Sequence, residues 1–151
     1  MNTGLDHIGF AVAGLDRSVA FYRDLLGMQV LWQRVYQEEY VRTLVGYPSA
    51  TLRCAYLEIP GSPVKLELLE YQNVARENGE LRRADPGNAH LALAVSDLDN
   101  LSRTLQAAGV KIVSSPVVST AGAFKGTKTM YVCDPDGISV QLLELHESHD
   151  G

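Results

Sequence analysis

Large and small side chains alternate in two short segments of the chain, residues 7–12 and 90–95, each of which begins at a histidine. The larger set comprises Ile8, Phe10 and Val12 in the first segment and Leu91, Leu93 and Val95 in the second. The other set is a histidine followed by glycine or alanine. Because neighbouring residues of a strand point to opposite faces, each segment is predicted to be a strand that packs its larger side chains on a helix. The smaller set leaves open space beside His7 and His90.

An amphipathic helix that ends at a glycine is predicted after each of these strands. Asp16 begins the first helix, as N-cap or first-turn residue, and Gly27 ends it. Ser96 or Asp97 begins the second helix, and Gly109 ends it. The apolar positions that define the two helices are Val19, Phe21, Tyr22, Leu25 and Leu26, and Leu98, Leu101, Leu105 and Ala108.

The two segments belong to an internal repeat. When His7 is aligned with His90, Asp16 aligns with Asp99, and the two helix-ending glycines align after a shift of one residue. The ends of the two halves also match, at residues 67–70 (ELLE) and 141–144 (QLLE). We therefore interpret the chain as two copies of one module.

The remaining apolar runs complete a strand-helix-strand-strand-strand order in each half. These strands are predicted at Met28–Tyr36, Thr51–Ile59 and Val64–Tyr71 in the first half, and at Lys111–Ser119, Lys128–Cys133 and Ile138–Leu145 in the second. Pro116 is expected to interrupt the strand at Lys111–Ser119. Residues 37–50 are predicted to be an irregular excursion. The predicted fold is α+β: a single domain, residues 1–151, of two tandem βαβββ modules that form a curved, barrel-like mixed sheet with the helices outside. The modules span 5–71 and 89–145, with a linker at 72–88 and a tail at 146–151.

Composition and charge restrict the classes of partner. A chain of 151 residues with 46% hydrophobic and 21% charged residues is typical of a soluble globular protein with one core. The net charge of -5 disfavours nucleic acid, and no basic cluster or long apolar segment indicates a membrane partner. Cys54 and Cys133 lie in predicted strands without CxxC spacing, and residues 1–6 do not resemble an export signal. We expect a cytoplasmic protein with reduced thiols.

Four residues at equivalent positions of the two modules form the candidate functional site: His7, Glu67, His90 and Gln141. If the modules face each other, two imidazoles and two oxygen donors converge with room for a ligand. This donor set suits a divalent metal such as nickel, zinc, cobalt, manganese or iron(II), at a catalytic rather than a structural site. The competing interpretation is that each histidine satisfies its hydrogen bonds in the core.

Five motifs make the sequence similar to the vicinal oxygen chelate superfamily, which includes glyoxalase I, methylmalonyl-CoA epimerase, extradiol dioxygenases, and fosfomycin and bleomycin resistance proteins. They are 5–9 (LDHIG), 21–27 (FYRDLLG), 65–69 (KLELL), 90–92 (HLA) and 134–137 (DPDG). The resemblance covers residues 5–145. It implies paired modules, a metal held by the first and last strands of each, a small metal-chelating substrate and a homodimer.

The sequence departs from its relatives at informative positions. Where glyoxalases, epimerases and dioxygenases usually have a glutamate, this chain has Gln141, whose amide cannot accept a proton at neutral pH. Glu67 is then the general base that remains at the metal. The positions where glutathione-using glyoxalases carry arginine and asparagine hold Ala11 and Tyr71, and Lys125 is the matching candidate for gripping a substrate carboxylate. The resemblance therefore favours a substrate other than glutathione.

These residues lead to one main hypothesis and two alternatives. The main hypothesis is a metal-dependent lyase or isomerase, glyoxalase- or epimerase-like, in which Glu67 removes a proton alpha to a carbonyl. A second proton-transfer group could come from Glu38 or Glu39. The alternatives are an iron(II) ring-cleaving dioxygenase and a metal-free drug-binding protein. Trp32, Tyr71 and Phe124 are expected to line the substrate pocket. Tyr56 and Tyr131 occupy equivalent places in the repeat and either could face the cavity, but core packing is the favoured expectation for both.

Overall fold

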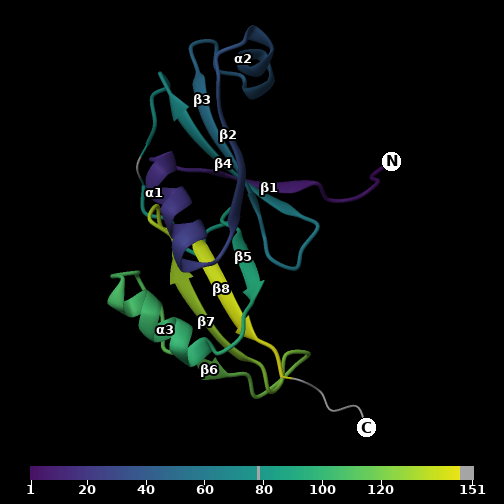
Figure 1. Cartoon of the computed structure of the whole chain (residues 1–151), viewed down its shortest axis with the longest axis vertical. Coiled ribbons are helices and arrows are strands. Elements are labelled where there is room, and N and C mark those ends of the chain that lie inside the picture. The colour runs from purple at the N-terminus through teal and green to yellow at the C-terminus, as the bar shows by residue number, and fades with distance from the viewer. Residues whose placement is uncertain (78, 147–151) are drawn as a thin grey trace. The chain divides into compact units, whose positions relative to one another are not determined.

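The computed structural model describes residues 1–77 and 79–146 and divides into two compact units, Met1–Asn78 and Gly79–Gly151. The division falls within the predicted linker, residues 72–88. The predicted tail is described only at residue 146, and residues 147–151 lie outside the described part. Each unit contains the expected βαβββ order, so the predicted α+β fold of two tandem modules is confirmed (Figure 1).

The first unit is a four-stranded mixed sheet with two helices and a π-helical turn. Its elements are β1 (His7–Ala11), α1 (Leu15–Ala20), the π-helical turn η1 (Phe21–Leu25), β2 (Gln29–Tyr36), α2 (Glu39–Val45), β3 (Thr51–Glu58) and β4 (Lys65–Gln72). The strand order is β1-β4-β3-β2, in which β1 is parallel to β4 and the other pairs are antiparallel. The first and last strands of the module are therefore neighbours.

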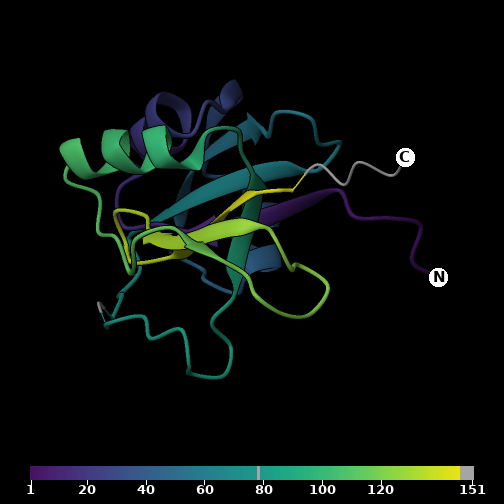
Figure 2. The same cartoon turned by 90° about the horizontal axis from the view of Figure 1, so that it is seen from below.

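The second unit repeats this topology with one long helix. Its elements are β5 (His90–Ala94), α3 (Leu98–Ala107), β6 (Val117–Val118), β7 (Lys128–Cys133) and β8 (Ser139–Glu144). The strand order is β5-β8-β7-β6, and β5 is parallel to β8. Helix α3 lies over one face of this sheet (Figure 2).

Each sheet has two faces of different character, as the alternation predicts. We call the side covered by α1 or α3 the helix face and the other side the histidine face. In β1 and β5 the histidines and the small residues are exposed, whereas the larger residues are partly or fully buried. The largest fully buried side chains on the helix faces and their helices are Leu15, Tyr22, Leu57, Leu66, Leu68, Leu98, Leu105, Met130, Val132, Val140 and Leu142. Both cysteines are buried free thiols.

Helix α2 corrects the prediction of an irregular excursion at residues 37–50. Its buried Val41 packs on Leu52 and Cys54 of β3, together with Val45 and other partly buried neighbours. The helix ends at Gly46, which has a left-handed φ of 76° that few other residues adopt without strain. As a result, α2 covers one end of the histidine face in the first unit.

Strand β6 is shorter than predicted. Only Val117 and Val118 pair with β7, and Ile112 forms an isolated bridge with Val132. Pro116 separates the two because proline has no backbone N–H to donate to a neighbouring strand.

A π-helical turn follows α1 and has no counterpart after α3. Residues Phe21–Leu25 form this turn, and the side chains of Phe21 and Tyr22 within it are buried. A π-turn accommodates one residue more than an α-helix does over the same length. It therefore explains the shift of one residue between the two copies of the repeat, and it keeps the apolar residues directed at the sheet.

Strand β2 contains one unpaired residue. Val30 pairs with Leu57 and Trp32 pairs with Tyr56, so Leu31 is the extra residue of a β-bulge. In a regular strand Val30 and Trp32 would share a face. The bulge instead directs Val30 to the helix face and Trp32 to the histidine face.

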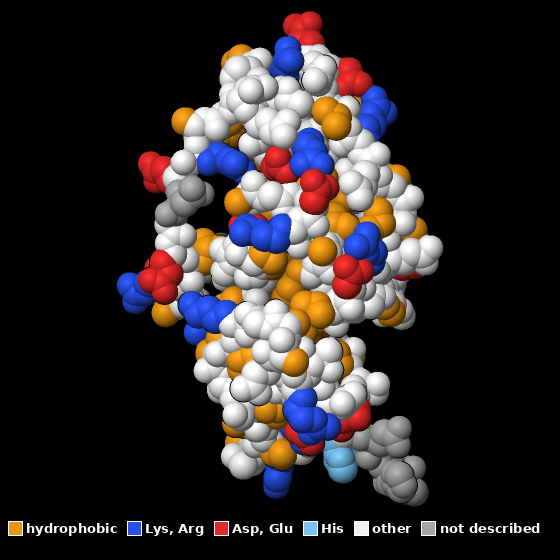
Figure 3. All heavy atoms as spheres, turned by 60° about the vertical axis from the view of Figure 1, so that its left-hand side comes forward, with side chains coloured by type: hydrophobic (Ala, Val, Ile, Leu, Met, Phe, Trp, Pro, Cys, Tyr) orange, Lys and Arg blue, Asp and Glu red, His pale blue; other side chains and the backbone are white. Residues whose placement is uncertain are grey.

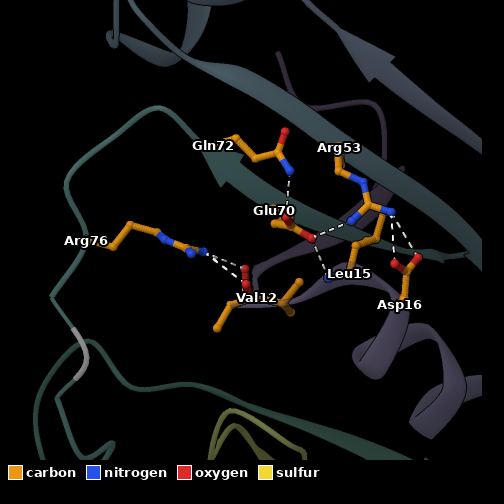
Figure 4. Close-up of polar contacts among 8 residues, drawn as sticks. Val12, Leu15, Asp16, Arg53, Glu70, Gln72 and Arg76 are labelled. Atoms are coloured by element: carbon orange, nitrogen blue, oxygen red, sulfur yellow. Dashed lines mark hydrogen bonds and ion pairs between the residues drawn. The ribbon is translucent and has the colours of Figure 1, made fainter.

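A buried carboxylate on β4 holds the beginning of α1. Glu70 Oε2 accepts a hydrogen bond from the Leu15 N–H at 2.7 Å and lies 2.9 Å from Arg53 Nη1, while Arg53 Nη2 binds Asp16 (Figure 4). Gly14, at the N-cap position, has no side chain to do this. Arg76 adds hydrogen bonds to the carbonyl groups just before the helix. The helix is therefore fixed to the sheet by its first backbone N–H.

The second unit repeats this arrangement. Glu144 Oε2 accepts the Leu98 N–H at 2.7 Å, and Lys128 Nζ binds Asp99 at 2.7 Å. Here Asp97 also caps α3 by accepting the Asn100 N–H. Both copies thus have, at equivalent places, a carboxylate that accepts the first N–H of the helix and a cation on the neighbouring strand.

Acidic and basic side chains are interspersed on the face shown in Figure 3 rather than gathered by sign. Among the described residues, no helix combines the length and the apolar character that a membrane span requires.

We predict that Glu70→Gln lowers the free energy of unfolding by about 1–3 kcal/mol, because it removes the charge that binds Arg53 and the helix N-terminus. Urea unfolding followed by circular dichroism measures this loss. Asp24→Asn is the matched control, because Asp24 is exposed and binds only the adjacent Arg23 among the described residues. An equal loss in both variants would contradict the prediction.

The same carboxylate predicts a dependence on pH. Burial acts to raise the pKa of Glu70, but hydrogen bonds from Leu15 and Gln72 and the charge of Arg53 outweigh it and lower the pKa below 4.5. The stabilisation is therefore complete above pH 4.5 and is lost as the pH falls through the folded-state pKa. Unfolding free energies measured from pH 6 to pH 3 should converge for wild type and Glu70→Gln at the acid end. A constant difference across this range would show that the charge of Glu70 is not responsible.

Candidate functional site

The first unit brings His7 and Glu67 together on its histidine face. Parallel pairing places Glu67 opposite Gly9, two residues along β1 from His7. His7 Nε2 lies 3.2 Å from Glu67 Oε2, and the two side chains are 40% and 21% exposed. Gly9 has no side chain beside Glu67, where a β-carbon would lie in van der Waals contact with Oε2 at 3.7 Å. We call His7 Nε2 and Glu67 Oε2 the first donor pair.

Asp6 and Tyr56 surround the other side of the His7 ring. Asp6 Oδ2 lies 2.7 Å from His7 Nδ1 and accepts a hydrogen bond from the Tyr56 hydroxyl at 2.9 Å. The Tyr56 ring meets the His7 ring edge-on and stacks on Trp32, with centroids 5.0 Å apart. Hydrogen bonds from His7 and then Tyr56 lower the pKa of Asp6. Trp32 therefore lies on the histidine face with the Tyr56 ring between it and His7, and its part in lining a substrate pocket stays a prediction.

The far end of this histidine face is closed by apolar packing. Tyr71 lies under α2 and meets Tyr47 edge-on, with ring centroids 5.8 Å apart. Its burial, chiefly, raises the pKa of Tyr71. Cys54 is buried in the same cluster, and burial followed by the nearby charge of Glu67 raises the pKa of its thiol to about 11. Tyr71 is thus on the expected face, but it packs against the helix that the sequence analysis missed.

The second unit brings His90 and Gln141 to a common neighbour. The Tyr131 hydroxyl donates to Gln141 Oε1 at 3.2 Å and lies 3.4 Å from His90 Nε2. Gln141 Nε2 donates in turn to Thr129 Oγ1 at 3.1 Å. We call His90 Nε2 and Gln141 Oε1 the second donor pair. That the two donor pairs share one ion stays a prediction.

Tyr56 and Tyr131 correct the expectation that both pack in the core. Each is half-buried, and its hydroxyl bonds a residue of the histidine face. Tyr56 pairs across the sheet with Glu67, and Tyr131 pairs with Gln141. The repeat could have indicated this role, because the two tyrosines occupy equivalent places in it. In each copy, one turn separates the strand of the tyrosine from the strand of the candidate ligand.

Lys125 and Phe124 lie in the loop between β6 and β7. The Lys125 N–H donates to the carbonyl of Gly122, and Phe124 is 58% exposed. Among the described residues, the hydrogen bonds of the His90 and Gln141 side chains go to Tyr131 and Thr129 and not to this loop. Their part in binding a substrate stays a prediction.

Glu38 and Glu39 are the predicted sources of a second proton-transfer group. Glu38 binds Arg34 at 2.6 Å, and Arg34 also lies over the Tyr36 ring. Hydrogen bonds from backbone N–H groups and then from Arg34 lower the pKa of Glu38. Glu38 is therefore held ionised by neighbours of its own, and Glu39 is the first residue of α2.

The first donor pair fits a divalent metal ion. Two ligands at right angles, each about 2.1 Å from a metal, lie roughly 3 Å apart, which is close to the spacing of His7 Nε2 and Glu67 Oε2. The contact of His7 Nδ1 with Asp6 is the kind of outer hydrogen bond that metal-binding histidines make. Within each unit, no three histidine, cysteine, aspartate or glutamate side chains of the described residues gather closely enough to hold a metal.

The chain belongs to the Glyoxalase/Bleomycin resistance protein/Dioxygenase superfamily, whose sequence profile matches residues 4–142. This confirms the resemblance found in the sequence motifs. The matched residues include both donor pairs.

Relatives of this superfamily align over most of the chain. The 2-epi-5-epi-valiolone epimerase of an Actinomyces species is 30% identical over 143 residues, which are 92% of this chain and 78% of the relative. A probable lactoylglutathione lyase of Vibrio cholerae is 28% identical over 96% of this chain and 93% of the relative. A glyoxalase family protein from Bacillus cereus has the same fold, with a TM-score of 0.84, 18% identity, and coverage of 96% of this chain and 95% of that chain.

We predict that Cys54 is protected from thiol reagents in the folded protein. A pKa of about 11 instead of 9.0 lowers the thiolate fraction at pH 8 about 100-fold. The rate of reaction with a disulfide reagent should therefore be at least that much lower in buffer than in urea. The measurement uses a Cys133→Ala background, so that only Cys54 reports. Equal rates in buffer and in urea would contradict the burial of Cys54.

Proposed function

We propose that this protein is a metal-dependent lyase or isomerase that transfers a proton alpha to a carbonyl group of a small, metal-chelating substrate. The observation that carries the proposal is the first donor pair, in which a partly exposed carboxylate lies 3.2 Å from an imidazole nitrogen. The names of the epimerase and lactoylglutathione lyase relatives support the reaction class.

His7 and Glu67 would hold the metal with His90 and Gln141. A bound divalent cation would supply Lewis-acid polarisation of the substrate carbonyl. Its identity among nickel, zinc, cobalt, manganese and iron stays open in this proposal. The two imidazole nitrogens and two side-chain oxygens are donors that such ions accept.

Glu67 is the proton-transfer group in this proposal. Its carboxylate takes the proton from the carbon next to the carbonyl, and the electrons of the broken C–H bond form a carbon–carbon double bond as the carbonyl oxygen becomes negative. The reverse movement returns the proton to the same carbon. When the proton returns to the neighbouring carbon instead, the adjacent hydroxyl group of the substrate passes its own proton to the former carbonyl oxygen, so atoms and charge balance in both cases. Gln141, at the equivalent place in the second unit, cannot take a proton at neutral pH. One carboxylate therefore carries the proton in both directions.

The surroundings of Glu67 restrict the substrate. The stacked rings of Trp32 and Tyr56 form a wall beside His7, and α2 closes the other end of the face over Tyr71. Ala11 and Tyr71 replace the arginine and asparagine with which glutathione-using relatives bind their substrate. A small carbonyl compound with an adjacent oxygen, rather than a glutathione adduct, fits this environment.

Exchange of the substrate proton with solvent tests the reaction class. Protein loaded in turn with each of the five metals is incubated in heavy water with small α-hydroxyketones and 2-oxoacids, and proton NMR follows the loss of the alpha-proton signal. Metal-dependent exchange supports the proposal. Binding of a metal without exchange of any compound would contradict it, as would exchange that persists without metal.

Glu67→Gln should lower the exchange or turnover rate about 10²–10⁴-fold, because the amide keeps an oxygen ligand but cannot accept the proton. Metal content by mass spectrometry should remain measurable in this variant. Gln141→Glu is the matched control at the equivalent position, and it should retain both metal and activity. Full activity in Glu67→Gln would remove the assignment of Glu67 as the base.

A further inference from the structure

The two histidines differ in what lies behind their rings. His7 is preceded by Asp6, whose carboxylate lies 2.7 Å from Nδ1, whereas His90 is preceded by Ala89. His90 meets the Tyr131 hydroxyl through Nε2 at 3.4 Å, which is the same nitrogen that the second donor pair uses. Both copies of the repeat therefore place a histidine nitrogen and a side-chain oxygen at equivalent positions, but they differ in the group that contacts the histidine ring.

Asp6 is itself held in place. It is exposed, yet its Oδ2 takes part in two short contacts, with His7 and with the Tyr56 hydroxyl. Tyr56 is in turn fixed on β3 by stacking on Trp32 and by pairing across the sheet with Glu67. The carboxylate is thus tied to the sheet even though it precedes the first residue of β1.

We infer that Asp6, anchored by Tyr56, is a positioning residue that keeps the proton of His7 on Nδ1 and directs Nε2 at Glu67 as a preformed ligand. This inference rests on the proposed function only for the identity of what Nε2 binds. A carboxylate that accepts Nδ1–H fixes the tautomer and ring orientation of a histidine and increases its basicity toward a metal. The first donor pair is therefore organised before a metal arrives.

The geometry of Asp6 supports this role, because one carboxylate oxygen lies within hydrogen-bond distance of both His7 Nδ1 and the Tyr56 hydroxyl, and a carboxylate oxygen accepts hydrogen bonds. Both of its neighbours can donate, His7 through Nδ1–H and Tyr56 through its hydroxyl. Replacing Asp6 with asparagine keeps one accepting oxygen but removes the charge. Replacing it with alanine removes both the accepting oxygen and the charge. The alanine variant should therefore have the larger effect on His7 and the asparagine variant the smaller one.

Calorimetry with Zn²⁺ measures the first consequence. Asp6→Ala should raise the Kd for Zn²⁺ about 10–100-fold, and Asp6→Asn should recover part of this loss. Tyr56→Phe should weaken binding less, because the carboxylate remains. The controls are Asp24→Asn, which removes the same charge, and Tyr47→Phe, which removes a hydroxyl from the same face without touching Asp6. Equal Kd values in wild type and Asp6→Ala would overturn the inference.

Long-range ¹H–¹⁵N NMR of the His7 ring separates this inference from the proposed function. With or without zinc, the wild type should show a proton on Nδ1 that exchanges slowly with solvent, and Asp6→Ala should lose this protection. If the wild type binds no metal but the Nδ1 proton is protected, the proposed function fails and the positioning role stands. If zinc binds and the Nδ1 proton is unprotected in the wild type, the positioning role fails and the proposed function stands.

Discussion

A carboxylate on the last strand of each module, bonded to the first backbone N–H of the module's helix, is the interaction on which both units depend. Glu70 binds the Leu15 N–H and Glu144 binds the Leu98 N–H, each at 2.7 Å. The first N–H groups of a helix have no partner within it and carry partial positive charge, so a fixed anion stabilises them. Because the last strand also pairs with the first, this contact ties helix, first strand and last strand together.

The same strand carries a structural and a candidate functional carboxylate three residues apart. Glu70 points to the helix face and is buried, whereas Glu67 points to the histidine face and is partly exposed. Odd and even positions of a strand face opposite sides, so an odd spacing separates the two roles. In the second unit Glu144 keeps the structural role, while the other position has become Gln141. The module can therefore change its chemistry without losing the contact that fixes its helix.

The sequence was sufficient for the repeated topology because alternation in the strands and glycines after the helices are local signals. Strand β7 was predicted with its observed bounds, Lys128–Cys133. Helix α2 was not predicted, because its first turn follows two polar residues and only Val41 and Val45 of the helix pack in the apolar cluster. The π-turn η1 was visible only as one residue of misalignment between the copies. Both features depend on packing against the sheet.

The candidate site was predicted in part for similar reasons. Repeat equivalence identified His7 and Glu67, and pairing in the sheet brings them together. Tyr56 was missed because β3 is buried on both faces along most of its length, under α1 on one side and α2 on the other. Its sequence therefore does not alternate clearly, and burial could not be assigned to Tyr56 by pattern. Asp6 was quoted within a motif, but its contact with His7 is a matter of side-chain geometry.

The unpaired Leu31 has a consequence for how this edge strand can vary in length. Removing Leu31 would turn β2 into a regular strand in which Val30 and Trp32 keep their present faces. Removing a residue between Trp32 and Tyr36 would instead move the side chains on one side of the deletion to the opposite face of the sheet. A deletion of one residue therefore preserves the two faces of β2 at the bulge and exchanges them for part of the strand two residues later.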